Sequence, residues 1–93
     1  MKAYPKIKGV QPQDGKRLLV TFDNGTRKIY DCKPLLTTKI FEVLQEDGFF
    51  NSVQADPGGY GVSWSEEMDL SESELWEHGQ LVDPEDAADS ESL

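Results

Sequence analysis

Two short stretches of the chain alternate apolar and polar residues in the way that a half-buried β-strand does. They cover residues 17–22 (RLLVTF) and 27–31 (RKIYD), and Asp-Asn-Gly-Thr separates them. Asn24 and Gly25 tolerate the positive φ that a type I′ turn requires at both of its central residues. The pattern therefore predicts an antiparallel β-hairpin around Asn24-Gly25.

The turn type fixes which residues face each other across this hairpin. The predicted pairs are Phe22 with Arg27, Val20 with Ile29, and Leu19 with Tyr30. One face of the hairpin then carries four apolar residues and is the predicted core face: Leu18, Val20, Phe22 and Ile29.

A helix is predicted near residues 38–47. Leu36, Ile40 and Leu44 recur at the four-residue spacing of one helix face. Gly48 follows, where a left-handed C-terminal cap belongs. A shorter strand is predicted at residues 7–11, between two prolines.

Two more elements are predicted in the second half of the chain. Residues 51–56 and 60–65 form a second hairpin, in which Pro57 and Gly58 suit the central positions of a type II turn. Ser71-Glu72-Ser73-Glu74 forms a capping box, in which Ser71 and Glu74 bond each other's backbone N–H. This box opens a short helix that runs to His78 and ends at Gly79.

These elements predict one small α+β domain over residues 1–80. Its sheet is antiparallel, with two hairpins and an N-terminal strand, and it packs against a central helix and a short C-terminal helix. Residues 81–93 are predicted to form a disordered acidic tail, because from residue 83 on they contain five acids and almost no apolar residue that can anchor a core.

Charge is divided unequally along the chain. All nine Lys and Arg lie in residues 1–40, with only three acids, whereas residues 41–93 hold the other fifteen acids. Such asymmetry is typical of a nucleic-acid contact or an interaction tail, although both halves can also fold together and simply keep the surface hydrated.

Targeting and membrane signals are absent from the sequence pattern. No stretch approaches the roughly 18 apolar residues of a membrane span, and the N-terminus lacks the apolar run of a signal peptide. The single cysteine, Cys32, cannot form an internal disulfide. We expect a cytoplasmic protein.

No catalytic, metal or cofactor motif is found. His78, the only histidine, falls in the last turn of a short helix, where a structural role at the helix C-terminus is favoured. Cys32 is expected to be an inert, partly buried thiol, and Trp64 and Trp76 to belong to the core. We therefore expect no enzyme, no metal and no cofactor.

The densest run of carboxylates is a candidate acidic interaction surface. As a calcium loop starting at Asp69 it fails, since the sixth position is Glu74 and the twelfth is Gln80. An acidic turn and helix start explain the run equally well. The candidate residues are Glu66, Glu67, Asp69, Glu72 and Glu74.

The lysines and arginines of the first strands form a candidate basic binding face. The predicted hairpin places four of them near one end, and two lie on the adjacent strand. Such a face can contact phosphates or an acidic partner, but lysines on edge strands also guard against aggregation. The candidate residues are Lys6, Lys8, Lys16, Arg17, Arg27 and Lys28.

The order of several short motifs resembles the small bacterial family known as domain of unknown function 2442. The motifs include Tyr4-Pro5-Lys6-Ile7, Leu18-Leu19-Val20-Thr21-Phe22 with Asp23-Asn24-Gly25, Tyr30-Asp31-Cys32-Lys33-Pro34-Leu35-Leu36, Phe49-Phe50, Gly59-Tyr60-Gly61-Val62-Ser63-Trp64 and Asp69-Leu70-Ser71 before Leu75-Trp76. The likeness spans roughly Tyr4 to Gly79, and it implies a compact α+β domain without catalytic residues.

The resemblance also implies that a neighbouring gene encodes a second small protein. Members are commonly encoded beside another small protein and suspected of forming toxin–antitoxin-like pairs, and some carry a following helix-turn-helix domain. Here an acidic stretch stands in its place, which argues against stand-alone sequence-specific DNA binding. Two hypotheses follow: a non-enzymatic, antitoxin-like interaction module for a small basic partner, or a nucleic-acid or regulatory binder using the basic hairpin face.

Overall fold

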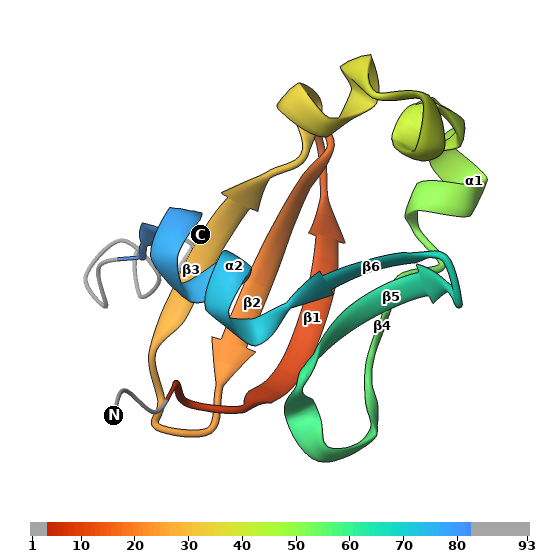
Figure 1. Ribbon diagram of the computed structural model, residues 1–93. Coiled ribbons are helices and arrows are strands. Elements are labelled where there is room, and N and C mark those ends of the chain that lie inside the picture. The colour runs from red at the N-terminus through yellow and green to blue at the C-terminus, as the bar shows by residue number, and fades with distance from the viewer. Residues whose placement is uncertain (1–3, 83–93) are drawn as a thin grey trace.

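The computed structural model describes residues 4–82, and Figure 1 shows the arrangement of their elements. The mixed α+β character and the antiparallel pairing predicted from the sequence are confirmed. In chain order the elements are β1 (Ile7–Gln13), β2 (Arg17–Phe22), β3 (Arg27–Asp31), the 3₁₀ helices η1 (Lys33–Thr37) and η2 (Lys39–Gln45), α1 (Asp47–Phe50), β4 (Gln54–Ala55), the 3₁₀ turn η3 (Pro57–Gly59), β5 (Gly61–Ser65), β6 (Met68–Ser71), α2 (Glu72–His78) and β7 (Gln80–Leu81).

The strands form two sheets where the sequence predicted one. The first has the order β1-β2-β3-β7 and the second β4-β5-β6, and all neighbours are antiparallel. β6 and β7 were not predicted from the sequence. In β6, Met68 and Leu70 alternate with polar residues, but this short alternation lies inside the acidic run and was interpreted as a turn.

The first hairpin exists, but its predicted type I′ turn is wrong. Gly25 has a φ of 89°, whereas Lys16 is the one non-glycine with positive φ among residues 4–82, so Asn24 does not adopt it. The Asn24 side chain instead accepts a hydrogen bond from the Thr26 backbone N–H at 2.9 Å. Gly25 N–H donates to the Phe22 carbonyl, and Phe22 N–H to the Thr26 carbonyl. A loop of three residues therefore joins the strands.

This loop shifts the hairpin register by one residue from the predicted pairing. Leu18 faces Tyr30 and Leu19 faces Ile29. Tyr30, not Ile29, consequently joins the core face of the sheet, because directly paired residues point to the same side. The core residues are Ile7, Leu18, Val20, Phe22, Tyr30, Cys32, Leu44, Phe50, Val53, Val62, Leu70 and Leu75.

A helix does form within the predicted range of residues 38–47, but it is the 3₁₀ helix η2 and not an α-helix with a four-residue period. In a 3₁₀ helix, residues three apart share a face. Phe41 and Leu44 accordingly point inward, and Leu44 is fully buried, whereas Ile40 keeps 51% of its surface exposed. Gly48 lies inside α1 and does not cap a longer helix.

Trp64 of β5 fixes this irregular segment to the second sheet. Its indole N–H donates to the Phe50 carbonyl at 2.9 Å. Its ring centroid lies 6.4 Å from that of Phe41 and 6.1 Å from that of Phe50. Trp64 and Trp76 both pack against the core as half-buried residues, as predicted.

The second predicted hairpin is confirmed, with Gln54 paired to Ser63 and Ala55 to Val62. Gly58 has φ 84° and ψ −9°, the values of the third residue of a type II turn. Gly59 lies so close to β1 that a Cβ on it would stand 2.7 Å from the Ile7 carbonyl oxygen. The turn therefore connects the second sheet to the first.

The first sheet extends beyond the predicted domain boundary at residue 80. β7 pairs with β3, and the Val82 backbone N–H donates to the Arg27 carbonyl at 2.9 Å. The rest of the predicted tail, residues 83–93, lies outside the described residues. No helix within residues 4–82 is long and apolar enough to span a membrane.

Candidate interaction surfaces

The candidate basic residues do not form one cluster at one end of the hairpin. Arg17 begins β2 and pairs with Asp31, whereas Arg27 begins β3 and pairs with Thr21. Since the strands are antiparallel, the beginning of one lies beside the end of the other. The prediction that Lys16, Arg17, Arg27 and Lys28 lie together is wrong for this reason.

Three of the six candidate lysines and arginines contact residues that are distant from them in the sequence. The Lys6 ammonium pairs with Glu72 at 3.1 Å and lies 4.4 Å from the centroid of the Tyr60 ring. Lys16 pairs with Asp47, and its ammonium lies 5.2 Å from the centroid of the Phe50 ring. These contacts bind the β1 region to α1, α2 and the second hairpin.

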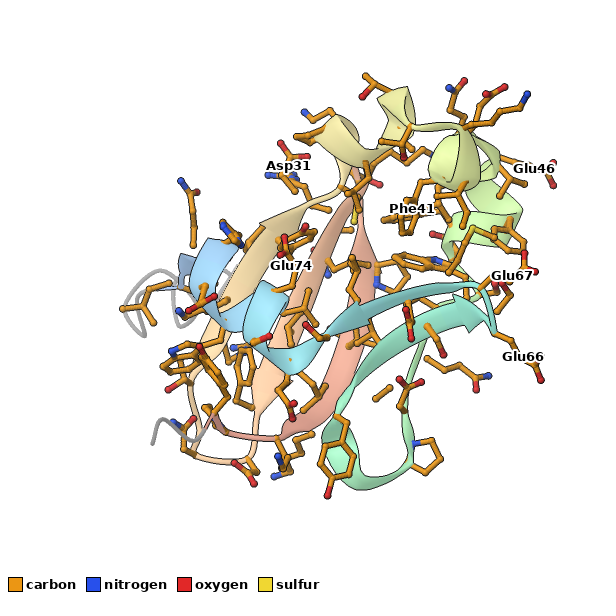
Figure 2. All side chains as sticks on the ribbon, viewed as in Figure 1. Asp31, Phe41, Glu46, Glu66, Glu67 and Glu74 are labelled. Carbon is orange, nitrogen blue, oxygen red and sulfur yellow. The ribbon has the colours of Figure 1, made fainter. Side chains whose placement is uncertain are left out.

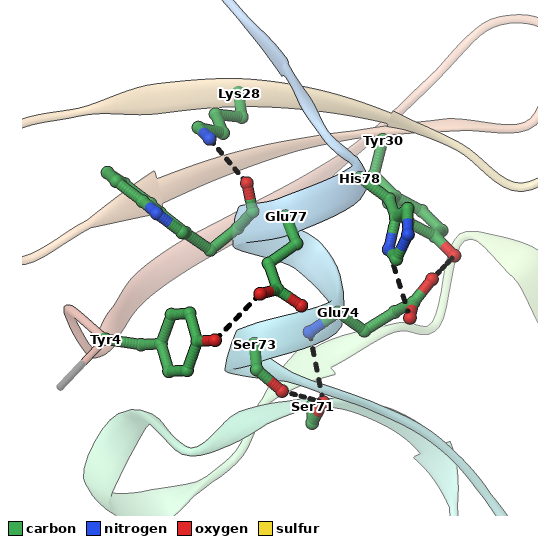
Figure 3. Close-up of polar contacts among 9 residues, drawn as sticks. Tyr4, Lys28, Tyr30, Ser71, Ser73, Glu74, Glu77 and His78 are labelled. Carbon is green, nitrogen blue, oxygen red and sulfur yellow. Dashed lines mark hydrogen bonds and ion pairs between the residues drawn. The ribbon is translucent and has the colours of Figure 1, made fainter. Parts of the chain in front are cut away.

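Lys28 is the third of these residues. Its ammonium donates to the Trp76 carbonyl near the end of α2 and lies 3.9 Å from the centroid of the indole ring (Figure 3). A cation at this position complements the partial negative charge of a helix C-terminus. Lys28 therefore holds α2 on the first sheet.

Arg17 and Arg27 lie on the face of the first sheet that points away from the core. We call this the open face, and its central residues are Gln11, Arg17, Leu19, Thr21, Arg27 and Ile29. They alternate with the buried positions of β2 and with their partners in β1 and β3. In Figure 1, α2 and the second sheet cross the front of the first sheet, on its core side.

A shallow hollow of about 370 Å³ lies at one end of the open face. Its lining mixes both signs of charge with one apolar side chain: Arg17, Ile29, Asp31, Lys33, His78 and Gln80. The Arg17 Nε–H donates to the Asp14 carbonyl at 3.0 Å, which holds the guanidinium beside the β1–β2 turn. Lys8, the remaining candidate, is exposed at the β-bulge of β1.

The candidate acidic residues divide into an exposed group and an engaged group. Glu66, Glu67 and Asp69 are exposed on the β5–β6 turn and on β6. Glu72 pairs with Lys6, and the Glu74 carboxylate accepts a hydrogen bond from the Tyr30 hydroxyl at 2.8 Å. Only the exposed group is available to a partner without breaking a contact within residues 4–82.

Tyr30 of β3 and Glu74 and His78 of α2 form a series of polar contacts, with His78 at its exposed end (Figure 3). The second oxygen of Glu74 lies 3.3 Å from His78 Nδ1. Burial, followed by the hydrogen bond to Glu74, raises the pKa of the Tyr30 hydroxyl, so this group remains a donor at every ordinary pH. His78 occupies the last turn of α2, as predicted.

The contacts of Glu74 with Tyr30 and His78 also explain why the predicted capping box is only half formed. Ser71 Oγ accepts a hydrogen bond from the Glu74 backbone N–H at 3.2 Å, which is the expected N-cap. The Glu74 side chain, however, is turned toward Tyr30 and His78. The reciprocal bond to Ser71 is therefore replaced by a tertiary one.

Two exposed apolar residues of η2 were missed in the sequence. Ile40 and Val43 are 51% and 42% exposed, and they share one side of η2 because they are three residues apart. The exposed acids Glu42 and Glu46 lie beside them in the chain, and the exposed Lys39 directly precedes Ile40. The sequence does contain a pattern that predicts this pair. Apolar residues recur every three positions, so Phe41 and Leu44 share one side of a 3₁₀ helix and Ile40 and Val43 share another.

Figure 2 shows Glu46, Glu66 and Glu67 projecting outward on the same side of the view, whereas Phe41 points inward. We call Ile40, Val43, Glu42 and Glu46, with Glu66 and Glu67, the acidic end. It combines exposed apolar side chains with carboxylates that bear no ion pair within residues 4–82.

Cys32 is fully buried directly after β3. Burial, and then the charge of Asp31, raises the pKa of its thiol to about 12. The thiolate is the reactive form, so this thiol is protonated and unreactive at neutral pH. The predicted inert character agrees with this environment. Within residues 4–82, no group of His, Cys, Asp and Glu has the arrangement of a metal site.

Comparison with known proteins gives a family and no further relative. Neither the curated proteins nor the solved structures gave a match. The model of the family described as "Protein of unknown function (DUF2442)" matches residues 7–80, which include strands β1 to β6 and α2. The resemblance inferred from the sequence motifs is confirmed, and the chain belongs to the DUF2442 family.

Proposed function

We propose that this protein is a non-enzymatic protein-interaction module of the bacterial cytoplasm, the antitoxin-like member of a small two-gene pair. Its partner is a small basic protein, and the acidic end is the surface that binds it. The observation that supports this proposal is the exposed pair Ile40 and Val43, with the exposed acids Glu42 and Glu46 close by in the same segment.

The acidic end has the composition that a specific contact with a basic protein requires. Apolar side chains at the centre of an interface supply most of its binding energy when water is excluded from them. Carboxylates around them speed the encounter with a positively charged partner and select against other partners. Exposed apolar residues on a 3₁₀ helix contribute little to the core, so their presence favours an interaction role.

The test is a pull-down from native lysate with the tagged full chain and two matched variants. Ile40→Ser combined with Val43→Ser removes the apolar pair, and Leu81→Ser removes a residue that is 70% exposed on β7. We expect the wild type and Leu81→Ser to retain the same small basic protein, and the double variant to lose it. Repeated absence of any small co-purifying protein overturns the proposal.

The charge of the acidic end is tested on the purified pair. Glu42→Gln with Glu46→Gln should slow association more than it speeds dissociation, because charges at an interface rim act mainly on the encounter. High salt should have the same effect on the wild type and little effect on the variant. A dissociation rate that changes more than the association rate argues against steering by these carboxylates.

Nucleic-acid binding through Arg17 and Arg27 is the second candidate. Both arginines lie on the open face, but this face carries no aromatic side chain on which bases can stack. Fluorescence anisotropy with mixed DNA and RNA at about 50 mM salt tests it, since phosphate contacts are strong there. Binding that Arg17→Glu with Arg27→Glu abolishes supports this function, and no binding at low salt excludes it.

A further inference from the structure

The open face has an apolar centre that the core does not explain. Leu19 and Ile29 face each other across β2 and β3, and both are half-buried. Neither belongs to the buried core or to the apolar residues that pack against it. In the described part of the chain, α2 contacts the other side of the first sheet, through Phe22, Lys28 and Tyr30.

Exposed amide side chains border this apolar centre on both sides. Gln11 of β1 pairs with Leu19. On the opposite edge, Gln80 of β7 pairs with Ile29. One row across the sheet therefore reads glutamine, leucine, isoleucine, glutamine, and both glutamines are exposed. An apolar centre inside a polar rim is the composition of a protein–protein interface.

The adjacent row carries both signs of charge. Arg17 of β2 pairs with Asp31 of β3, which places a cation and an anion side by side. Asp31 Oδ1 accepts a hydrogen bond from the Lys33 backbone N–H at 2.9 Å, and this bond orients the carboxylate. The Asp14 carbonyl holds the Arg17 guanidinium through its Nε–H. Neither charge takes part in an ion pair within residues 4–82, so both are available to another molecule.

These rows are complementary to themselves. A two-fold axis that runs parallel to the strands, between β2 and β3, places β2 of one copy over β3 of the other, and each contact then occurs twice. Apolar residues meet apolar residues, amides meet amides, and a cation meets an anion. The facing pairs are Leu19 with Ile29, Gln11 with Gln80, Arg17 with Asp31, and Thr21 with Arg27.

The charges favour this axis over the alternative. An axis perpendicular to the strands places Arg27 over Asp31 of the other copy. Arg17 and Lys33 already lie beside Asp31 in the hollow, so three cations then surround one carboxylate. The parallel axis alternates Arg17 and Asp31 of the two copies and leaves Arg27 beside a threonine.

The size of the face suits a weak and reversible contact. With strands about 4.8 Å apart and residues about 3.4 Å apart, four strands of five residues cover roughly 19 Å by 17 Å. Two such faces, with their side chains, provide about the 1,000 Å² that lies at the low end of specific interfaces.

We infer that the open face is a docking surface for a second copy of this chain, and that the two sheets pack face to face about the parallel axis. The acidic end lies outside the open face, so the dimer presents two acidic ends. Arg17 is covered, so dimerisation competes with any nucleic acid that binds through this arginine. The inference goes beyond the proposed function and does not rest on it.

Sedimentation equilibrium of the full chain measures this association between about 1 μM and about 1 mM. At about 150 mM salt the Debye length is about 8 Å, which screens most of the repulsion between two chains of net charge −9. We expect monomer at the lower concentration and mainly dimer at the higher. In NMR spectra over the same range, the amides of Leu19 and Ile29 should shift, whereas those of Ser65 and Glu66 on the β5–β6 turn should not.

The apolar centre is tested with one added charge on either side of the sheet. Leu19→Lys places two unpaired ammonium groups inside the dimer and should weaken it at least about tenfold. Leu81→Lys is the matched control, since Leu81 is 70% exposed and pairs with Lys28, whose ammonium lies on the α2 side. The control should associate like the wild type. The amide spectrum of each variant shows whether it is folded.

The axis is tested by exchanging the two charges that it brings together. Arg17→Asp and Asp31→Arg should each remain monomeric, because like charges then face each other twice. An equal mixture of the two variants should form a mixed dimer, since both facing pairs regain opposite charges. The double variant, which also restores the pair within each chain, should dimerise with itself.

Three results overturn the inference. A wild type that stays monomeric up to about 1 mM means that a second copy is not the occupant, and an anionic ligand held by the arginines becomes the candidate. Association that Leu19→Lys leaves unchanged means that a different surface forms the contact. Dimers of Arg17→Asp alone, or a mixture of the two charge variants that associates no better than either one, mean that the sheets do not face each other about this axis.

Discussion

The β2–β3 hairpin and the connecting segment at residues 33–50 are neighbours in the chain, but their backbones are held in different ways. In the hairpin, hydrogen bonds repeat between strands that are only a few residues apart. In residues 33–50, single turns of 3₁₀ helix are held by aromatic contacts to Trp64, which lies in another sheet. The hairpin is specified by its own residues, and the segment by residues far from it in the sequence.

The difference shows how far a local pattern can be followed. A period of two residues predicts a strand wherever a neighbouring strand is close in sequence. A period near four residues predicts an α-helix only if packing against the rest of the fold does not favour another backbone conformation. Here Phe41 and Leu44 both pack against the core from adjacent 3₁₀ turns. This packing outweighs the α-helical preference that the four-residue period indicates.

The largest effect is expected where the connecting segment enters the core. Leu44→Ala should lower the free energy of unfolding by about 2–5 kcal/mol, as for other buried leucines, because Leu44 is fully buried. Ile40→Ala, on the exposed side of η2, should change it by less than about 0.5 kcal/mol. Urea unfolding measures both. Similar costs for the two would mean that Ile40 and Leu44 share an inward helix face after all.

The contact between the two sheets should give the next largest effect. Gly59→Ala should cost about 1–3 kcal/mol, because Gly59 has a φ of 77° and its Cβ would meet the Ile7 carbonyl. Gly48→Ala is the matched control, since no atom lies within 4 Å of its Cβ position. It should leave stability unchanged or raise it by up to about 1 kcal/mol. Thermal unfolding of both variants checks this contrast.

The hairpin register is tested by Tyr30→Phe, with an expected cost of about 1 kcal/mol for the lost hydrogen bond to Glu74. Tyr60→Phe, at a residue that is 60% exposed, should have no measurable effect. A double-mutant cycle with Glu74→Gln isolates the pair. If the two changes prove additive, Tyr30 and Glu74 do not interact, and the register with Ile29 on the core face regains support.

The smallest effect near neutral pH is expected at Cys32, where the regular sheet ends. Its pKa is raised from 9.0 to about 12 in the folded protein. The unfolded chain therefore loses the thiol proton first, so the stability that this group contributes is complete below pH 9.0 and declines as the pH rises toward 12. Cys32→Ala should show a shallower decline over this range in urea unfolding. Identical slopes would mean that the thiol ionises equally in both states.

The sequence was sufficient for the elements whose partners are local. The first hairpin, the Pro57-Gly58 turn and the short helix ending at His78 were all predicted, because turn chemistry and capping act within a few residues. The predicted register of the first hairpin was wrong by one residue. The Asn24 side chain bonds to Thr26 and selects a three-residue loop, and Asn-Gly is compatible with both loops.

The candidate surfaces were predicted less well than the fold. The residue types were identified, but Arg17 and Arg27 each begin a strand of an antiparallel pair, so they lie at opposite ends of the hairpin. The contacts that engage Lys6 and Lys28 cross from the first strands to Tyr60 and Trp76. No pattern within the basic stretch itself indicates these partners. The exposed pair Ile40 and Val43 was missed because the segment was interpreted as an α-helix, in which Ile40 lies on the inward face.

The position of β7 also sets the order in which this domain can be completed as it is synthesised. β3 pairs with β2 early, but its other edge waits for Gln80 and Leu81, about fifty residues later. Until they emerge from the ribosome, β3 is an unprotected edge that can pair with another chain. Lys28 and Arg27 lie on this edge, and their charge discourages such pairing. Lys28, which holds α2 on the sheet in the folded protein, thus first protects the edge of β3 in the nascent chain from pairing with another chain.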